Sequence, residues 1–177
     1  MSEERIATAL ERLESVLRAR PSFAEHEETP AVARWQDGLR LKVSHPKSDL
    51  KVQTDLPEEL GGDGDGVTPG WLMRAGLAAC AASSILLNAA AEGIELQSLE
   101  LTAGACCDVR GLLGMADENG APVSAAFTVV RLLVRVSAPG VPRERLQALI
   151  ERANQRSPVS SALQHSVPVE LSLELQD

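Results

Sequence analysis

Apolar positions near the start of the chain recur every three or four residues. The residues on this spacing are Ile6, Leu10, Leu13 and Leu17. Such a period is that of one face of an α-helix, and a proline such as Pro21 cannot continue a helix. We therefore expect an amphipathic helix over residues 3–20, which packs as an outer arm or against a partner chain. A Glu-rich linker follows over residues 22–30.

Between residues 31 and 55 the pattern shortens to strand-like runs. The runs read AVARW, LRLKV and DLKVQTDL, with an Asp37-Gly38 turn after the first and a His45-Pro46 turn after the second. An Asp-Gly pair between two alternating runs is typical of a β-hairpin. We expect a meander of three short strands, followed by a flexible glycine-rich loop over residues 61–66, whose glycines can adopt positive φ.

The most apolar stretch of the chain begins TPGWLMRAGLAAC at Thr68 and continues through an alanine-rich run to Gly93. Thr68 is a good N-cap, and Pro69 suits the first helical position because its missing N–H is not needed there. The run is apolar nearly all round, which predicts a long helix buried on most sides. It is not long and clean enough to predict a membrane span.

Two longer strand-like runs follow at residues 94–110 and 123–137, joined by a glycine-containing loop. Pro142 begins a further amphipathic helix, Ser157 and Pro158 are typical of the N-cap and first turn of another, and VPVELSLEL over residues 167–175 alternates like a last strand. The order of these elements predicts the α+β class.

Composition and charge limit the range of functions. The formal net charge is -8, and the basic residues are scattered rather than clustered. A nucleic-acid partner is therefore not expected. The N-terminus lacks the features of a secretory signal, and we expect a cytoplasmic protein without a membrane partner. In that compartment Cys80, Cys106 and Cys107 are expected to be reduced.

The position of Cys80 leaves two interpretations open. The helix dipole acts only within the first turn, and Cys80 lies about three turns from the N-terminus of the helix. Arg74 lies on a different face of the helix, so neither the dipole nor this arginine activates the thiol. Gly76 and Ser84, one turn to either side, share the face of Cys80. The spacing alone favours small residues that allow close helix packing around an inert thiol, and a reactive cysteine is the alternative.

The segment DLPEELGGDGDGVTPGWLMRAGLAAC, the alanine-rich helix after it and the later SPVSSAL together resemble the OsmC/Ohr family of thiol-dependent hydroperoxide reductases. The resemblance covers residues 31–177 and leaves residues 1–30 as an N-terminal extension. It implies antiparallel sheets around a long central helix and an intertwined homodimer with a site at each subunit interface. There Cys80 would attack the peroxide, with an arginine from the N-terminal strands holding it as the thiolate.

The chain departs from the family pattern at two positions. Gly70 stands where the resemblance implies a glutamate that orients the arginine, and Ser157 stands where it implies a resolving cysteine. A serine cannot form a disulfide, and its position is explained by capping the next helix. Arg34 and Arg40 both flank the first hairpin turn; we favour Arg40 as the residue that serves Cys80, while a solvated strand charge is an equal alternative for each.

Other candidates have weaker support. Cys106 and Cys107 are adjacent on an expected strand, so only one could approach Cys80, and packing is the simpler role. The three histidines lack metal-ligand spacing, and no nucleotide-binding motif occurs, so we expect neither a metal nor a cofactor.

Two functional hypotheses follow. The first is an enzyme in which Cys80 and Arg40 reduce an organic hydroperoxide and an external thiol regenerates the cysteine. The second is a member of reduced catalytic power that binds a small apolar ligand or senses oxidation. In both, the residues expected to contact the small molecule are Trp71, Met73, Leu77, Ser84 and Ser157.

Overall fold

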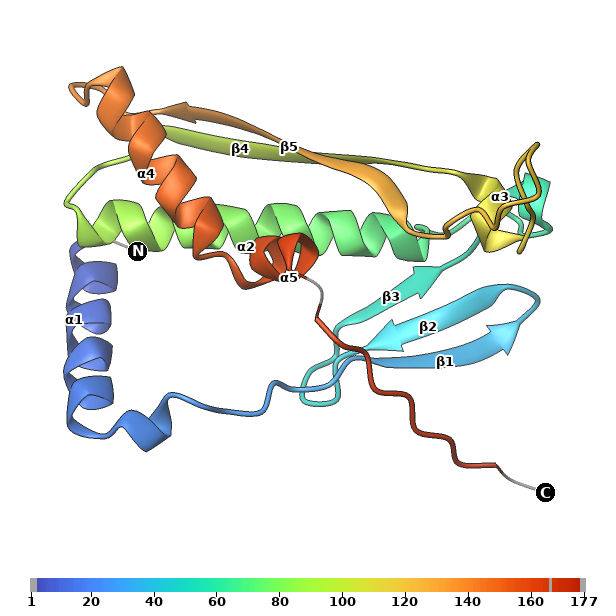
Figure 1. The fold of residues 1–177 in the computed structure, drawn as a ribbon. Coiled ribbons are helices and arrows are strands. Elements are labelled where there is room, and N and C mark those ends of the chain that lie inside the picture. The colour runs from blue at the N-terminus through green and yellow to red at the C-terminus, as the bar shows by residue number, and fades with distance from the viewer. Residues whose placement is uncertain (1–2, 166, 176–177) are drawn as a thin grey trace.

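Two antiparallel sheets and one long helix form the fold (Figure 1). The structure is a computed structural model, and it describes residues 3–165 and 167–175. The α+β class expected from the sequence is confirmed. The helices are α1 (Glu3–Ala19), α2 (Pro69–Ala91), α3 (Val109–Leu112), α4 (Arg143–Gln155) and α5 (Pro158–Gln164). The strands are β1 (Val32–Asp37), β2 (Arg40–Ser44), β3 (Lys51–Thr54), β4 (Ser98–Cys107) and β5 (Phe127–Ser137).

The first sheet has the order β1-β2-β3, as the expected meander requires. Leu41 lies opposite Trp35 on one side and Thr54 on the other. Gly38 has a φ of 48° at the β1–β2 turn, a backbone conformation that L side chains rarely adopt. The Asp-Gly hairpin prediction is therefore confirmed.

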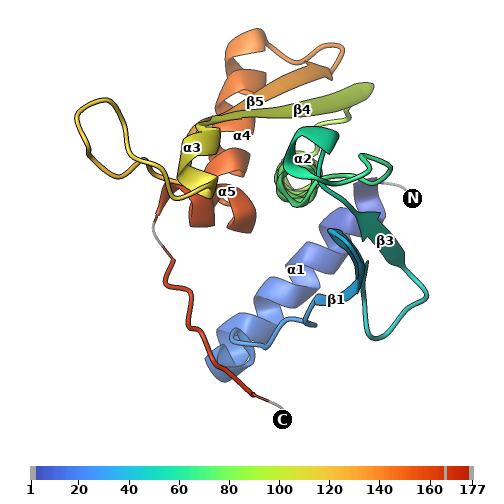
Figure 2. The ribbon, with the colours of Figure 1, turned by 90° about the vertical axis from the view of Figure 1, so that its right-hand side faces the viewer.

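Helix α2 runs through the middle of the molecule. Its N-cap is Thr68, whose Oγ1 accepts the N–H of Trp71 at 3.1 Å, and Pro69 occupies the first turn. Gly93, with a φ of 63°, follows its end. Figure 2 looks nearly along α2, with β4 and β5 on one side and α1 on the other. Both predicted ends of this helix are confirmed.

The burial predicted for α2 on most of its sides is not found in the single chain. By length and composition α2 is able to cross a membrane, contrary to our expectation, yet it packs against β4, α1, α4 and α5. Only 22% of its most apolar window is buried. The exposed positions are Pro69, Trp71, Gly76, Ala79, Ser83, Leu86, Leu87 and Ala91. Most of these lie on one face, which is small or apolar.

The hydrophobic core lies where the second half of α2 meets the β4–β5 ribbon and α4. Its buried members are Ile85, Ala89, Ile94, Ala138, Leu149 and Ala153. The two strands pair antiparallel from Ser98 opposite Ser137 to Cys107 opposite Phe127. Both strands are shorter than predicted, and the loop between them contains the short helix α3, which the sequence did not predict.

The final segment, residues 167–175, is extended but pairs with no strand among the described residues, so the last strand predicted from its alternation is wrong for the single chain. A strand needs a neighbouring edge to satisfy its backbone N–H and C=O groups, and this segment runs away from both sheets (Figure 1). Its apolar residues are strongly exposed, with Leu175 at 91% and Val169 at 93%.

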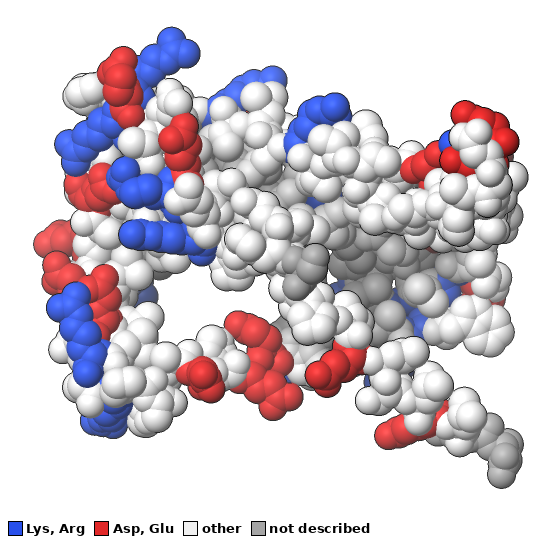
Figure 3. Space-filling view, viewed as in Figure 1, with Lys and Arg blue, Asp and Glu red and all other residues white. Residues whose placement is uncertain are grey.

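Helix α1 lies at one end of the molecule, where it begins near the C-terminal end of α2 and runs away from it, and it is joined to β1 by a linker (Figure 1). It contacts α2, which agrees with an outer arm. In Figure 3, charged side chains gather over α1 and the adjacent end of α4, whereas few are visible around α5.

Candidate active site around Cys80

Helix α5 brings Ser157 against Cys80 in the middle of α2. The hydroxyl of Ser157 donates to the Cys80 Sγ at 3.3 Å. Ser157 is completely buried, and Cys80 is partly buried. The contact places a hydrogen-bond donor against the sulfur of a cysteine, the residue type that acts as a nucleophile in its thiolate form.

Ser157 is the N-cap residue of α5, as predicted, but its hydroxyl does not cap the helix. No side-chain hydrogen bond to the first turn is formed, and the Ser161 N–H is accepted by the Ser157 carbonyl at 2.8 Å instead. The capping explanation for this serine is thus right about its position and wrong about its side chain. The hydroxyl is directed to Cys80, 77 residues earlier in the chain.

Arg40 lies at the start of β2, where carboxylates of its own chain surround it. Its guanidinium contacts Asp37 at 3.4 Å, Asp65 at 3.1 Å, and also Asp63. The hydrogen bond that Arg40 donates to Asp65 raises the pKa of Arg40 above its usual value, against the opposing effect of burial, and the charges of Asp63, Asp65 and Asp37 add to the rise. Among the described residues, the hydrogen bonds of this side chain all go to these carboxylates.

Asp55 stabilises the loop that supplies Asp63 and Asp65 by hydrogen bonds to its backbone. This role was not predicted from the sequence. The buried Asp55 carboxylate accepts the N–H groups of Leu56 at 2.8 Å, Asp63 at 2.9 Å and Gly64 at 3.0 Å. Burial raises the pKa of Asp55, but these three backbone donors together with the charge of Arg40 outweigh it and lower the pKa below its usual value. The only available signal was an aspartate six positions before the first glycine of the 61–66 loop.

The glycines of this loop are required by close backbone contacts. A Cβ at Gly62 would lie 1.9 Å from the carbonyl oxygen of Leu56, and one at Gly66 would lie 2.9 Å from the Asp55 nitrogen. The loop therefore folds tightly over Asp55, and the two aspartates that bind Arg40 project from a fixed backbone.

The residues expected to contact a small molecule are not all together. Leu77 is buried and lines a groove, whereas Trp71 is 48% exposed and Met73 is half-buried, and neither lines that groove. Ser84 is buried and donates to the carbonyl of Ala153 at 2.6 Å, which joins α2 to α4. The structure thus brings Ser157 to Cys80, places Leu77 one turn away, and uses Ser84 for helix packing.

Gly70 leaves space at the N-terminal end of α2 into which Arg74 extends. A Cβ at Gly70 would lie 3.5 Å from the Arg74 Nη1 and 3.5 Å from the Phe127 ring, both ordinary contacts. No ion pair forms at Arg74 among the described residues. The missing carboxylate at position 70 is therefore not replaced by a neighbouring one.

The other two cysteines lie on β4 and are both exposed, so the core-packing role considered for them is not found in the single chain. The register shifts between Cys106 and Cys107, because they pair with Val129 and Phe127 and leave an extra residue on β5. The guanidinium of Arg131 contacts the Cys106 Sγ at 3.5 Å. Neither thiol contacts Cys80 in the part of the chain that the structure describes.

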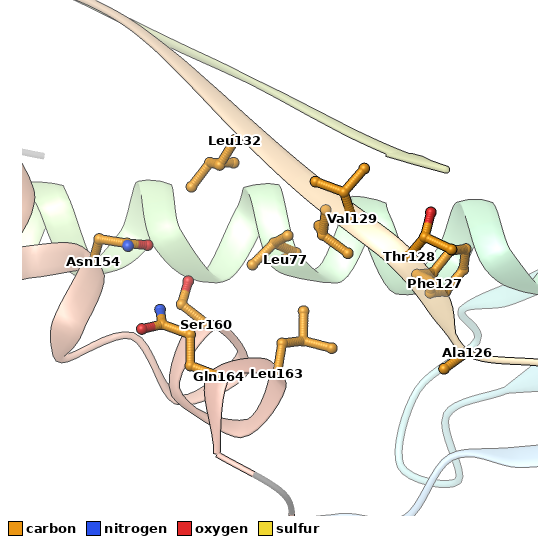
Figure 4. A pocket seen from close by; sticks show the side chains of 11 residues that line it. Leu77, Ala126, Phe127, Thr128, Val129, Leu132, Asn154, Ser160, Leu163 and Gln164 are labelled. Carbon is orange, nitrogen blue, oxygen red and sulfur yellow. The ribbon is translucent and has the colours of Figure 1, made fainter. Parts of the chain in front are cut away.

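A groove of about 630 Å³ opens between α2, the start of β5 and the α4–α5 corner (Figure 4). Cys80 and Ser157 do not line it, but its lining residue Leu77 lies one helical turn from Cys80. Its lining residues are Leu77, Ala126, Phe127, Thr128, Val129, Val130, Leu132, Asn154, Ser160, Leu163 and Gln164. Across residues 3–165 and 167–175, no cluster of three or more histidine, cysteine or acidic side chains is arranged to hold a metal ion.

A long central helix that carries a partly buried cysteine and packs against one of two antiparallel sheets defines the class of protein as α+β. The OsmC-like protein family model matches residues 62–172, and the chain belongs to this family. The resemblance seen in the sequence is therefore confirmed. The matched region includes α2, Cys80 and Ser157.

Comparison with known proteins agrees with this assignment. An organic hydroperoxide resistance protein of Xanthomonas axonopodis pv. citri (strain 306) is 32% identical over 133 residues, which are 74% of this chain and 83% of the relative. The crystal structure of an organic hydroperoxide resistance protein OsmC from Legionella pneumophila is 26% identical with a TM-score of 0.55, covering 85% of this chain and all of that one. An OsmC-like protein from Mycoplasma pneumoniae, 16% identical with a TM-score of 0.65, covers 80% of this chain and 91% of its own, and supports the fold alone.

Proposed function

We propose that this protein reduces organic hydroperoxides through Cys80, with an external low-molecular-weight thiol as the reductant. The proposal rests on the hydrogen bond from Ser157 to the Cys80 sulfur. That contact places a buried donor on the one cysteine that lies on the central helix. The names of the Xanthomonas and Legionella relatives give the substrate class.

The chemistry proceeds in three steps. The Cys80 thiolate attacks one oxygen of the O–O bond, the bond breaks, and the alcohol leaves after taking up a proton, so that Cys80 becomes a sulfenic acid. An external thiol then attacks the sulfenic sulfur, releasing water and forming a mixed disulfide. A second external thiol reduces this disulfide and restores Cys80. The external thiol is needed because Ser157 has no sulfur and the other two cysteines lie on β4.

We further propose that the active unit is a homodimer in which the partner supplies a cation to each Cys80. The face of α2 that carries Gly76, Ala79 and Ser83 is uncovered in the single chain, and its small side chains permit close approach of another helix. The exposed apolar residues of the 167–175 segment need a second strand edge. Arg40 is our candidate for the cation, and its partners Asp37, Asp63 and Asp65 would orient it.

The homodimer is tested by sedimentation of full-length variants. Leu171→Lys adds a charge to the apolar side of the terminal segment and should shift the protein toward monomer. Ser172→Lys, which adds the same charge to the alternate side, should shift it less. A wild-type protein that sediments as a monomer at micromolar concentration contradicts the proposal.

The enzymatic proposal is tested by consumption of cumene hydroperoxide in the presence of dithiothreitol. Cys80→Ser should abolish consumption, whereas Cys106→Ser and Cys107→Ser should leave it within about twofold of wild type. Mass spectrometry after a single equivalent of peroxide should locate a dimedone adduct on Cys80. Equal consumption by Cys80→Ser and wild type would exclude this thiol as the nucleophile.

A second function is favoured by the groove lined by Leu77. Because Gly70 and Ser157 remove two of the groups that the family resemblance implies, the chain could retain ligand binding without turnover. In that case Cys80→Ser should bind an apolar ligand as tightly as wild type, and wild type should consume no hydroperoxide with dithiothreitol or with a dithiol such as dihydrolipoate.

A further inference from the structure

The groove lined by Leu77 has two chemically different ends. Figure 4 shows the polar atoms of Asn154, Ser160 and Gln164 at the α4–α5 corner, and the side chains of Leu163 and Phe127 toward the start of β5. Its volume of about 630 Å³ falls in the usual range for small-molecule sites. The shape and the gradient of polarity suit an elongated molecule with one polar end.

Two polar atoms at the α4–α5 corner lack hydrogen-bond partners among the described residues. They are the Ser160 Oγ and the Asn154 Oδ1, and both are buried. The Ser160 residue is only 4% exposed. Buried polar groups in native proteins are nearly always paired, so two unpaired atoms on residues that line one groove indicate that a ligand group supplies the missing bonds.

The groove contains no charged side chain. Its polar members are Thr128, Asn154, Ser160 and Gln164, and the others are apolar. A carboxylate or ammonium bound there would lose its hydration without gaining a counter-charge, which is unfavourable. The Asn154 Oδ1 accepts and cannot donate, and a serine hydroxyl can do either. The complementary group is therefore neutral and offers at least one donor, as an alcohol or a primary amide does.

We infer that this groove binds an amphipathic molecule with a neutral hydrogen-bond-donating end at Asn154 and Ser160 and an apolar body along Leu77 and Leu163. The inference adds a ligand class to the proposed function. It rests on that function only where the bound molecule is taken to be the hydroperoxide substrate. Ser157 and Ser160 lie three residues apart on α5, as Leu77 and Cys80 do on α2. The groove thus lies one helical turn from the sulfur.

The test measures binding of octanamide to full-length Cys80→Ser protein by titration calorimetry, with N,N-dimethyloctanamide and octanoate as comparisons. Octanamide offers a donor, the dimethyl compound offers none, and octanoate is charged. We expect octanamide to bind about tenfold more tightly than either, which corresponds to roughly one hydrogen bond. Ser160→Ala and Asn154→Leu should each remove most of this preference.

Ser161→Ala is the matched control, because its hydroxyl lies near His165 and Ser161 does not line the groove. It should leave octanamide binding unchanged. Equal affinity for the three compounds, or an unchanged preference in Ser160→Ala, overturns the inference. Folded dimeric protein that binds none of the three also overturns it, because a second copy of the chain then fills the groove. Hydroperoxide consumption by the wild-type protein is measured separately and does not depend on any of these outcomes.

Discussion

Ser157 and Cys80 are joined by a hydrogen bond of 3.3 Å between two helices whose residues are 77 positions apart. The serine hydroxyl therefore occupies the place from which a second sulfur could reach Cys80. Position 157 therefore lacks a resolving thiol only because its side chain carries an oxygen in place of a sulfur. The backbone already holds this position next to Cys80.

Ser157→Cys should give the protein an internal resolving thiol. After a single equivalent of cumene hydroperoxide, we expect a disulfide between positions 80 and 157, because the sulfenic acid on Cys80 condenses with a nearby thiol. Intact mass under non-reducing conditions should show the loss of two hydrogens. Ser161→Cys, on the same helix but bonded toward His165, should form no such disulfide. A Ser157→Cys protein that retains both free thiols after oxidation would contradict the geometry.

Ser84→Ala should destabilise the fold by about 1–3 kcal/mol. The Ala153 carbonyl lies in the last turn of α4, where helix carbonyls lack intrahelical partners, and the Ser84 hydroxyl donates to it at 2.6 Å. Urea unfolding at pH 7 measures the change. Ser83→Ala, next to it on the exposed face of α2, should change the unfolding free energy by less than about 0.5 kcal/mol.

Asp55→Asn should remove part of the acid sensitivity of the fold. The folded-state pKa of Asp55 lies below its usual value, so its carboxylate contributes stability that is present above about pH 4 and is lost as the pH falls through the folded pKa. We expect the variant to be less stable at pH 7 and to lose less stability than wild type between pH 5 and pH 2. Urea midpoints across this range provide the measurement, with the exposed Asp49→Asn as control. Parallel curves for wild type and Asp55→Asn would disprove the role of the carboxylate.

Comparison of Arg40→Met with Asp65→Asn should separate two roles of the arginine. Arg40→Met removes the contact between β2 and the 61–66 loop and Asp65→Asn weakens it, so both should speed hydrogen exchange at the Asp63 and Gly64 amides. Only Arg40→Met removes the cation that we propose for the partner's thiol. We expect it to lower hydroperoxide consumption at least tenfold more than Asp65→Asn does. Equal losses would mean that Arg40 acts only by holding the loop.

Most elements could be predicted from local patterns because their signals are local. The period of Ile6 and Leu10, the Asp37-Gly38 turn and the Thr68-Pro69 start each depend on a few neighbouring residues. The short helix α3 was missed because four residues in a glycine-containing loop show no helical period. The 167–175 segment was predicted as a strand because alternation reports which side is apolar and does not report whether a pairing edge is present.

The site was only partly accessible from the sequence, because its contacts join distant segments. Cys80 stood out by its place in a recognisable motif. The direction of the Ser157 hydroxyl, the three N–H donors around Asp55 and the pairing of Ser84 with Ala153 depend on how α5, the 61–66 loop and α4 pack. A serine before a proline has the same local signature whether its hydroxyl caps a helix or meets a sulfur.

The sequence by itself determined the α+β class, the family and the cysteine on the central helix, because periodicity, turn residues and a motif are properties of consecutive residues. Only the tertiary structure decided that Ser157 donates to Cys80, that Arg40 is enclosed by carboxylates, and that a groove without charged side chains lies one helical turn from Cys80. These facts follow from side chains that packing brings together across tens of residues, and their energies depend on the burial that packing creates.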